Sequence, residues 1–375
     1  MPVEPIVERL RLEVIEPLKT RFVGRDEVVD LIALAIVAGE HLFLLGPPGT
    51  AKSAIIRQFA VSVQSRYFEY LLTRFSEPNE VFGPIDLVRL REGIVATVTT
   101  GMLPEAEFAF LDELFNANSA ILNNLLSVLN ERTYRRGSEV HHLPLLSLFS
   151  ASNSLPEDEA LRALFDRFLI RCHVKNLPRE SSVALLMAGW ELERSTPMQS
   201  TISAEELRQL STQVGQVDIT QIVARYADVM ARIRDLGISL SDRRAVKAMK
   251  LVAASALLCG RSVAHIADLW VLRYLWDRQE QIDPLHALIT KVLDEPVGDL
   301  VVHPLSKMVQ VDGETLARQL AELETQIAGK PRSLASLAQL RDRAASIADQ
   351  AAWLGDEALR ERIMTRVGPI LEQLG

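Results

Sequence analysis

The stretch HLFLLGPPGTAKSAIIRQFA, residues 41–60, decides the fold class. An apolar run is followed by a Gly- and Pro-rich turn and then by apolar residues at helical spacing. Glycines let such a turn fold tightly, and the first turn of the helix presents free N–H groups that bind phosphate. The order strand, turn and helix therefore predicts a phosphate-binding loop. Its residues are Gly46, Pro47, Pro48, Gly49, Thr50, Ala51, Lys52 and Ser53.

Two side chains of this loop have chemistry that suits a nucleotide. Lys52 can reach the β and γ phosphates, and the Ser53 hydroxyl can ligate Mg²⁺. The strict pattern has Gly where this chain has Ala51. Because that position opens the helix, we expect a negative φ there, which a methyl group tolerates. Taken alone, the motif has one alternative: a strand-to-helix turn with an incidental Lys-Ser pair.

The chain around the loop alternates apolar runs with segments of helix length. Strands separated by helices are typical of a parallel sheet flanked by helices. Residues 74–103 interrupt this alternation, and their Pro, Gly and short Val/Thr run predicts an inserted loop and hairpin. The strand candidates are 41–46, 68–73, 107–113 and 144–153, and the clearest helix candidates are 51–64 and 118–132.

Acidic and amide side chains end two of the predicted strands. FAFLDE (108–113) ends in Asp112, which we assign to the metal, and Glu113, which we assign to the base that activates water. Asn153 ends the next strand, where an amide can hydrogen-bond a γ-phosphate and the attacking water. In isolation the acidic pair would suit a helix cap, and Asn153 would suit a turn. Their order after the loop favours the catalytic interpretation.

Beyond residue 177 the strand-like runs stop and Ala-rich helical patterns follow. A connector near residues 294–303 then leads to three further helical stretches with short links, which suggests a small bundle. These stretches are 314–328, 333–353 and 356–374. We predict three domains: an α/β core over 1–177, an all-α domain over 178–285 and a C-terminal helical extension over 286–375.

Charge and composition narrow the possible functions. The chain of 375 residues has 41 Lys and Arg against 49 Asp and Glu, a net charge of -8, which argues against a grip on nucleic-acid phosphates. The N-terminus has no apolar leader, and the longest apolar run, residues 31–39, is about half of a membrane span. The 2 cysteines fit neither a disulfide framework nor a zinc site. We therefore expect a cytoplasmic protein without a membrane span.

Together these motifs resemble those of the AAA+ ATPases and, more narrowly, of their MoxR branch, whose P-loop is similar to GPPGTAKS. Within that branch the chain is most similar to the RavA group over roughly residues 5–285. The RavA group has a compact β-rich insert in its C-terminal region, which residues 314–374 do not match, so its decarboxylase partner is not carried over. The resemblance rests on LLTRFSEPNEVFGP (71–84), GMLPEAEFAFLDE (101–113), AILNNLLSVLNERTYRRG (120–137) and FSASNSLPE (149–157).

The resemblance implies a role for each candidate residue. Lys52 and Ser53 would be the Walker A pair, and Asp112 and Glu113 the Walker B pair. Asn153 would be sensor 1. The segment along the adenine would be Val23 and Gly24 in RFVGRDE.

Arginines complete the implied site. Arg167 in DRF would be the arginine finger that acts on the neighbouring subunit's nucleotide, and Arg243 in SDRR would be sensor 2. Arg171 and Arg244 are close enough in sequence to compete for these roles. From the residues alone, each of these arginines would be a solvated or ion-paired surface group.

The resemblance further implies Mg²⁺-dependent hydrolysis of ATP to ADP by a homo-hexamer. Members of the MoxR branch are chaperone-like and commonly work with a protein that carries a von Willebrand A domain. The insert 74–103 and the hairpin 131–142 would face the central channel or a partner. We expect an ATP-driven ring that remodels or activates a protein partner.

Two alternatives stay open. One is a nucleotide-dependent binding switch or scaffold with little turnover. The other is a DNA-translocating motor, for which the basic cluster would be Arg132, Arg135 and Arg136. The acidic total argues against the motor.

Overall fold

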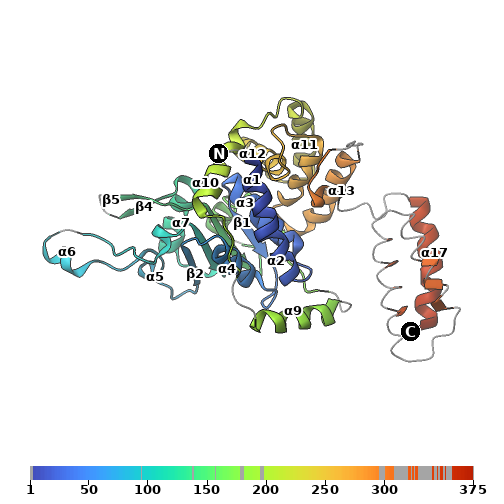
Figure 1. Ribbon diagram of the computed structural model, residues 1–375, viewed down its shortest axis with the longest axis horizontal. Helices are drawn as coiled ribbons and strands as arrows, with labels where there is room; N and C mark the ends of the chain where they lie inside the picture. The colour runs from blue at the N-terminus through green and yellow to red at the C-terminus, as the bar shows by residue number, and fades with distance from the viewer. Residues whose placement is uncertain are drawn as a thin grey trace. The chain divides into compact units, whose positions relative to one another are not determined.

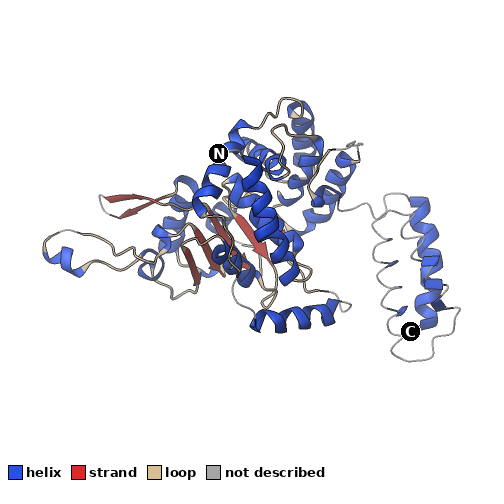
Figure 2. Ribbon diagram, viewed as in Figure 1, coloured by secondary structure: helices blue, strands red, loops and turns tan. Residues whose placement is uncertain are grey.

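The structure is a computed structural model that divides into two compact units, Met1–Ser306 and Lys307–Gly375. The first unit contains a sheet with helices packed around it and a further helical region (Figure 1, Figure 2). The structure describes residues 3–93, 95–136, 139–156, 158–177, 181–194, 198–294 and 300–307, separate positions between 320 and 351, and residues 357–374.

Five parallel strands form the sheet, in the order β2-β3-β6-β1-β7. Because all five are parallel, their carboxyl ends lie along one edge, which we call the carboxyl edge; the opposite one is the amino edge. β1 lies between β6 and β7, so the segments that follow these three strands are neighbours at the carboxyl edge. The bounds are β1 Leu42–Leu45, β2 Tyr67–Leu71, β3 Phe108–Asp112, β6 Ser147–Ser152 and β7 Ile170–His173.

Helices of the core pack against this sheet. α3 is its most buried helix, because every residue from Val28 to Ala38 is buried. This burial explains the apolar run that the sequence shows over residues 31–39. The helical elements are α1 Val3–Arg9, the π-helical turn η1 Leu10–Ile15, α2 Glu16–Arg21, α3 Asp26–Ala38, α4 Lys52–Ser62, η2 Leu103–Glu105, η3 Leu114–Asn116, α7 Ser119–Glu131 and α8 Glu159–Phe165.

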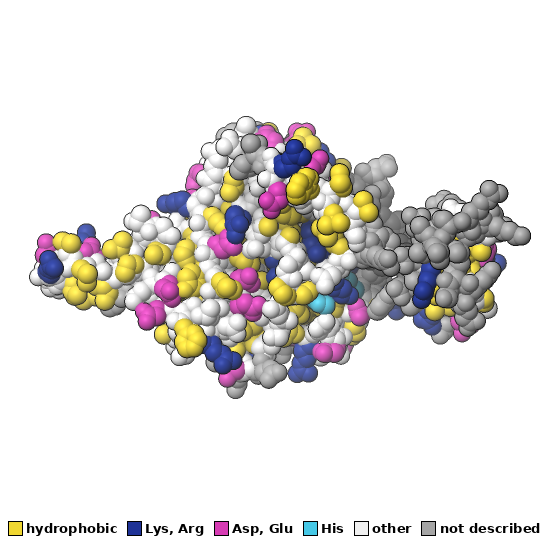
Figure 3. Space-filling view, turned by 90° about the horizontal axis from the view of Figure 1, so that it is seen from below, with side chains coloured by type: hydrophobic (Ala, Val, Ile, Leu, Met, Phe, Trp, Pro, Cys, Tyr) yellow, Lys and Arg dark blue, Asp and Glu magenta, His cyan; other side chains and the backbone are white. Residues whose placement is uncertain are grey.

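The insert, residues 74–103, forms an arm that projects from the first unit (Figure 1). It carries α5 Pro78–Phe82 and α6 Leu87–Arg91. The hairpin predicted here is reduced, in the described residues, to a single antiparallel bridge between Ile85 and Thr97. Hydrophobic side chains gather at the end of the arm (Figure 3), where Leu87 and Val88 are 68% and 69% exposed. A separate hairpin pairs β4 Thr133–Arg136 with β5 Glu139–His142.

The remaining part of the first unit is helical. α12 packs on both α3 and η6, and α13 packs on η6, so this region is joined to the core through buried helices. Trp270 and Trp276 are fully buried within it. Its elements are α9 Ser182–Arg194, α10 Ala204–Gln213, η5 Val214–Gln216, α11 Val223–Asp235, α12 Asp242–Leu258, η6 Ile266–Tyr274, η7 Gln279–Gln281, α13 Ile282–Leu293 and α14 Pro304–Lys307.

The second unit has its own apolar cluster. α17 spans Glu357–Leu374 and buries Ile363, Val367 and Ile370 at helical spacing. The predicted helices 314–328 and 333–353 lie mostly outside the described residues, but their described positions are helical and pack into the same cluster. Across the described chain, none of the helices combines the length and the apolar character that crossing a membrane requires.

The predicted fold class, an α/β core followed by helical parts, is confirmed, but one strand of the sheet escaped the sequence analysis. β7 is four residues long and carries Arg171 at its second position. A short apolar run that is interrupted by a charge gives no clear strand pattern. It is a strand because the tertiary structure places it beside β1, with which it pairs as the edge strand of the sheet.

Candidate nucleotide-binding site

The loop between β1 and α4 curls tightly at the carboxyl edge. A Cβ on Gly46 would lie 2.2 Å from the carbonyl oxygen of Val174, so only glycine fits there. Gly49 adopts a left-handed φ of +78°, and a Cβ there would meet no atom within 4 Å. Gly46 is therefore required because any Cβ would clash with the backbone, and Gly49 is required because of its left-handed backbone conformation.

Ala51 also adopts a left-handed conformation, with a φ of 65°. Our expectation of a negative φ at this position is wrong. The chain is still turning at Ala51, because α4 begins only at the next residue. A residue with a Cβ is strained in this region by roughly 1–2 kcal/mol, and strain of this kind is common where a loop is shaped for a ligand.

Lys52 is folded into the loop and is 7% exposed. Its Nζ donates hydrogen bonds to the carbonyl oxygens of Gly46, at 2.9 Å, and Pro47, at 2.7 Å. Burial lowers the pKa of Lys52, and Asp112 and Glu113 oppose this shift. The amides of Gly49, Thr50 and Ala51 donate no hydrogen bond to any other described residue. A buried cation beside unused amides at a helix N-terminus fits a phosphate group.

The predicted acidic residues and Asn153 meet at the carboxyl edge. The backbone N–H of Glu113 donates to Asp112 Oδ1 at 3.0 Å, and Asn153 Nδ2 donates to Glu113 Oε1 at 2.7 Å. Glu113 has a left-handed φ of 51°. Burial and the neighbouring Asp112 raise the pKa of Glu113, while Lys52 acts in the opposite direction. A carboxylate with a raised pKa is a stronger proton acceptor, which suits a general base.

The residues predicted to hold Mg²⁺ fit that ion chemically. Ser53 lies in the first turn of α4, and Asp112 ends β3, so both belong to the carboxyl edge. Hydroxyl and carboxylate oxygens are the hard ligands that Mg²⁺ takes, and it commonly completes its shell with water and phosphate oxygens.

A depression of about 440 Å³ lies between the start of α3, the segment that follows β7, and α13. Gly24 lines it, as the resemblance implies, and Val23 is half-buried beside it. Arg25 also lines the depression and donates from Nη1 to the carbonyl oxygen of Lys175 at 2.9 Å. The charge of Arg25 contributes to lowering the pKa of Lys52. Arg25 was not predicted from the sequence, where its signal was its position directly after Gly24.

Arg167 and Arg243 lie at the amino edge instead. Arg167 precedes β7, and Arg243 on α12 donates from Nη2 to Asn130 Oδ1 at 3.1 Å, at the end of α7. One turn further along α12, Lys247 pairs at 2.7 Å with Glu40, which precedes β1. Arg167 and Arg243 line one shallow depression. The 4 residues of β1 separate the two edges, a span of about 13 Å.

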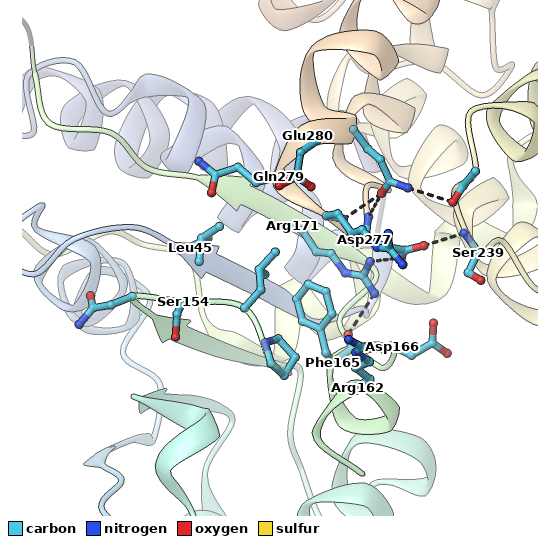
Figure 4. A pocket seen from close by; sticks show the side chains of 16 residues that line it. Leu45, Ser154, Arg162, Phe165, Asp166, Arg171, Ser239, Asp277, Gln279 and Glu280 are labelled. Carbon is cyan, nitrogen blue, oxygen red and sulfur yellow. Dashed lines mark hydrogen bonds and ion pairs between the residues drawn. The ribbon is translucent and has the colours of Figure 1, made fainter. Parts of the chain in front are cut away.

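Arg171 and Arg244 are not surface groups, so the expectation from the residues alone is wrong for both. Each is almost completely buried, and both pair with the carboxylate of Asp277. Figure 4 shows Arg171 and Asp277 turned toward each other. The side chains of Arg171 and Arg244 are 1% and 3% exposed, so their guanidinium groups lie inside the fold.

Two family models match this chain. Residues 8–212 match the model described as the MoxR domain in the MoxR-vWA-beta-propeller ternary systems, and residues 218–289 match an AAA lid domain. The chain belongs to the MoxR family of AAA+ ATPases. Membership of this family implies that the chain binds a nucleotide.

Individual proteins and a solved structure are also similar to this chain. Two uncharacterized proteins of Methanocaldococcus jannaschii are 40% identical over 280 residues (74% of this chain, 72% of the relative) and 37% identical over 295 residues (78% and 77%). Chaperone MoxR1 of Mycobacterium tuberculosis is 27% identical over 161 residues, 42% of each chain. A crystal structure from Cytophaga hutchinsonii, of a protein provisionally described as an ATPase, has the same fold. Its TM-score is 0.64 at 17% identity, over 78% of this chain and 95% of that one.

Proposed function

We propose that this MoxR-family protein hydrolyses ATP to ADP and phosphate with Mg²⁺, as a hexameric ring that remodels or activates a protein partner. We base the hydrolytic part on one observation: Asn153 Nδ2 donates to Glu113 Oε1 at 2.7 Å, beside Asp112 and the phosphate-binding loop. A scaffold that only binds nucleotide has no need for a carboxylate oriented in this way. The same observation therefore favours turnover over the switch alternative.

Each residue at the carboxyl edge has a separate task in this proposal. The amides of the loop and the Lys52 ammonium hold the β and γ phosphates. Ser53 and Asp112 would hold Mg²⁺, which offsets phosphate charge when it is bound. Glu113 takes a proton from the attacking water, and Asn153 keeps the Glu113 carboxylate in position.

The positions of the arginines support the proposed ring. Arg167 and Arg243 are at the amino edge, so they cannot act on the phosphates held at the carboxyl edge of their own chain. A head-to-tail arrangement brings the amino edge of one subunit to the carboxyl edge of the next, and it forms a ring when the rotation between subunits closes. We therefore assign the arginine finger to Arg167 and sensor 2 to Arg243, both acting on the neighbouring subunit. Six subunits are what the AAA+ resemblance implies.

The partner is proposed to be a protein with a von Willebrand A domain. The matching family model is named for systems in which a MoxR domain occurs with such a domain. The exposed apolar end of the arm also suits a protein surface, because exposed apolar patches commonly mark protein contacts. A closer relationship to the RavA group stays a prediction.

The basic cluster of the DNA-motor alternative does not act as one group that could bind nucleic acid. Arg132 donates to the carbonyl oxygens of Gly39, at 2.6 Å, and Leu145. Arg135 pairs with Glu131 at 3.7 Å. Two of the three arginines thus have internal partners, and nothing in the described chain favours this alternative over a protein client.

The substitution Glu113→Gln tests the proposal. It removes the proton acceptor but keeps the size of the side chain, so we expect ATP to bind normally while phosphate release falls by at least about 100-fold. Binding is measured with a fluorescent ATP analogue, and assembly is measured by light scattering in ATP. Glu131→Gln, at an exposed acid in a surface ion pair, is the matched control and should turn over normally. Undiminished phosphate release in Glu113→Gln would refute hydrolysis at this site, and a chain that stays monomeric in ATP would refute the ring.

A further inference from the structure

A buried cluster of charges joins the sheet to the helical region. Asp277, which follows η6, accepts hydrogen bonds at Oδ1 from Arg171 Nη1 on β7, at 2.5 Å, and from Arg244 Nη1 on α12, at 2.7 Å. Its Oδ2 accepts the backbone N–H of Ser239 at 2.6 Å. The Arg171 guanidinium lies over the Phe165 ring, 3.9 Å from its centroid. It donates hydrogen bonds to the carbonyl oxygens of Phe168, Phe165 and Trp276.

Charge balance in this cluster keeps Asp277 ionised. Burial alone would raise the pKa of Asp277, but Arg244 and Arg171 outweigh it and hold the pKa below its usual value. Burial and the nearby Arg244 lower the pKa of Arg171 to about 9, so Arg171 stays charged at neutral pH. Two buried cations therefore share one partly buried carboxylate, and a second carboxylate nearby is favourable.

Asp166 is that second carboxylate, and it also contacts the proposed arginine finger. Its Oδ1 lies 3.5 Å from Arg244 Nη1, and its Oδ2 lies 3.3 Å from Arg167 Nη1. Asp166 directly follows α8, at the amino edge, and its side chain is 38% exposed. The Nε of Arg167 is buried and has no hydrogen-bond partner among the described residues. Among the described residues, Asp166 is thus the acid that pairs with Arg167.

We propose that Asp166 is a positioning residue: it orients Arg167 toward the neighbouring subunit's nucleotide and links that orientation to the helical region through Arg244. The inference rests on the role proposed for Arg167. Buried Arg244 holds one oxygen of the Asp166 carboxylate, which restricts the orientation of that carboxylate. The Arg167 guanidinium, which pairs with the other oxygen, is therefore restricted as well. Because Arg244 belongs to α12, a movement of α12 relative to the sheet changes the hold on Arg167. The helical region can in this way adjust turnover in the adjacent subunit.

The first measurement compares Asp166→Asn with Asp166→Glu in the full chain. Asp166→Asn removes the charge that holds Arg167, and small misplacements of a catalytic group are costly, so we expect kcat to fall by about 10-fold. KM for ATP should stay the same, because the nucleotide is bound at the other edge of the sheet. Asp166→Glu, which keeps the charge, should recover most of the rate. Asp228→Asn, at an exposed acid 4.0 Å from Arg232 on α11, is the matched control.

Mixed rings distinguish a positioning role from a structural one. A subunit with Asp166→Asn has an intact carboxyl edge, and a subunit with Glu113→Gln has an intact finger. Mixing the two should restore activity above the weighted sum of the separate proteins, whereas mixing Asp166→Asn with Arg167→Ala should not. Activity could return when Arg167→Ala is mixed with Glu113→Gln but not when Asp166→Asn is mixed with Glu113→Gln. In that case the inference about Asp166 is wrong and the proposed finger stands. If neither mixture is restored, the proposed finger itself is wrong.

Discussion

In the proposed mechanism, the two edges of the sheet would carry different halves of one catalytic site. The carboxyl edge combines the phosphate-binding loop with Asp112, Glu113 and Asn153, which contact one another or lie near Lys52. The amino edge presents Arg167 and Arg243 in a single shallow depression. About 13 Å of β1 separates the two groups. A chain that carries both halves on opposite edges is incomplete alone, and its repetition around a ring would complete every site.

The arginines at the amino edge show a second difference. Arg167 and Arg243 are accessible, whereas Arg171 and Arg244, one to four residues away in sequence, are buried with Asp277. Accessible guanidinium groups can meet a phosphate of another subunit, whereas buried ones act only on groups within their own chain. We therefore expect neighbouring arginines of the same chemistry to have separate roles because of where their side chains lie.

The largest expected effect is on turnover in Arg167→Ala. An arginine finger typically contributes a factor of 10³ or more to kcat, so we expect a loss of about 1,000-fold. The affinity for ATP should change by less than about 2-fold, because Arg167 does not reach the loop of its own chain. Steady-state phosphate release and a nucleotide titration measure the two quantities. Arg66→Ala serves as the control, since Arg66 is an exposed arginine at the amino end of β2. A large loss of ATP affinity would mean that the two edges are not independent.

The sequence predicted the carboxyl edge better than the amino edge. Gly46–Ser53, Asp112-Glu113 and Asn153 each follow a strand candidate, and parallel strands bring such segments together whatever lies between them. Burial of Arg171 could not be predicted in the same way. It depends on Asp277, 106 residues later, and on Phe165 and Trp276. For the same reason β7 was missed, since its charged residue is acceptable in a strand only because that distant carboxylate reaches it.

A smaller but still clear effect is expected on stability in Arg171→Met. The substitution keeps apolar volume but removes the donor to three buried carbonyl oxygens and one of the two cations that pair with Asp277. Breaking a buried pair from one side commonly costs 3–5 kcal/mol, and Arg244 still pairs with Asp277, so we expect a loss of about 3 kcal/mol in the free energy of unfolding.

Arg167→Met is the comparison variant, which tests whether a buried and a partly exposed arginine contribute differently to the free energy of unfolding. Among the described residues, Arg167 pairs with Asp166 at 3.3 Å and is partly exposed, so its loss should change the free energy of unfolding by less than about 0.5 kcal/mol. Urea denaturation of the nucleotide-free chain measures both variants. Equal losses would show that the accessible arginine is as much a part of the fold as the buried one.

The smallest effect concerns the loop of the carboxyl edge itself, in Ala51→Gly. The left-handed φ of 65° at Ala51 costs a residue with a Cβ roughly 1–2 kcal/mol. Glycine removes that cost but adds about 0.5–1 kcal/mol of conformational entropy to the unfolded chain. The difference favours glycine by about 0.5 kcal/mol, to be measured by urea denaturation without nucleotide. Ala54→Gly, in the first turn of α4 where φ is helical, is the matched control and should lower stability by up to about 1 kcal/mol. If both substitutions destabilise the chain equally, Ala51 is not strained, and the loop is shaped by contacts other than its backbone conformation.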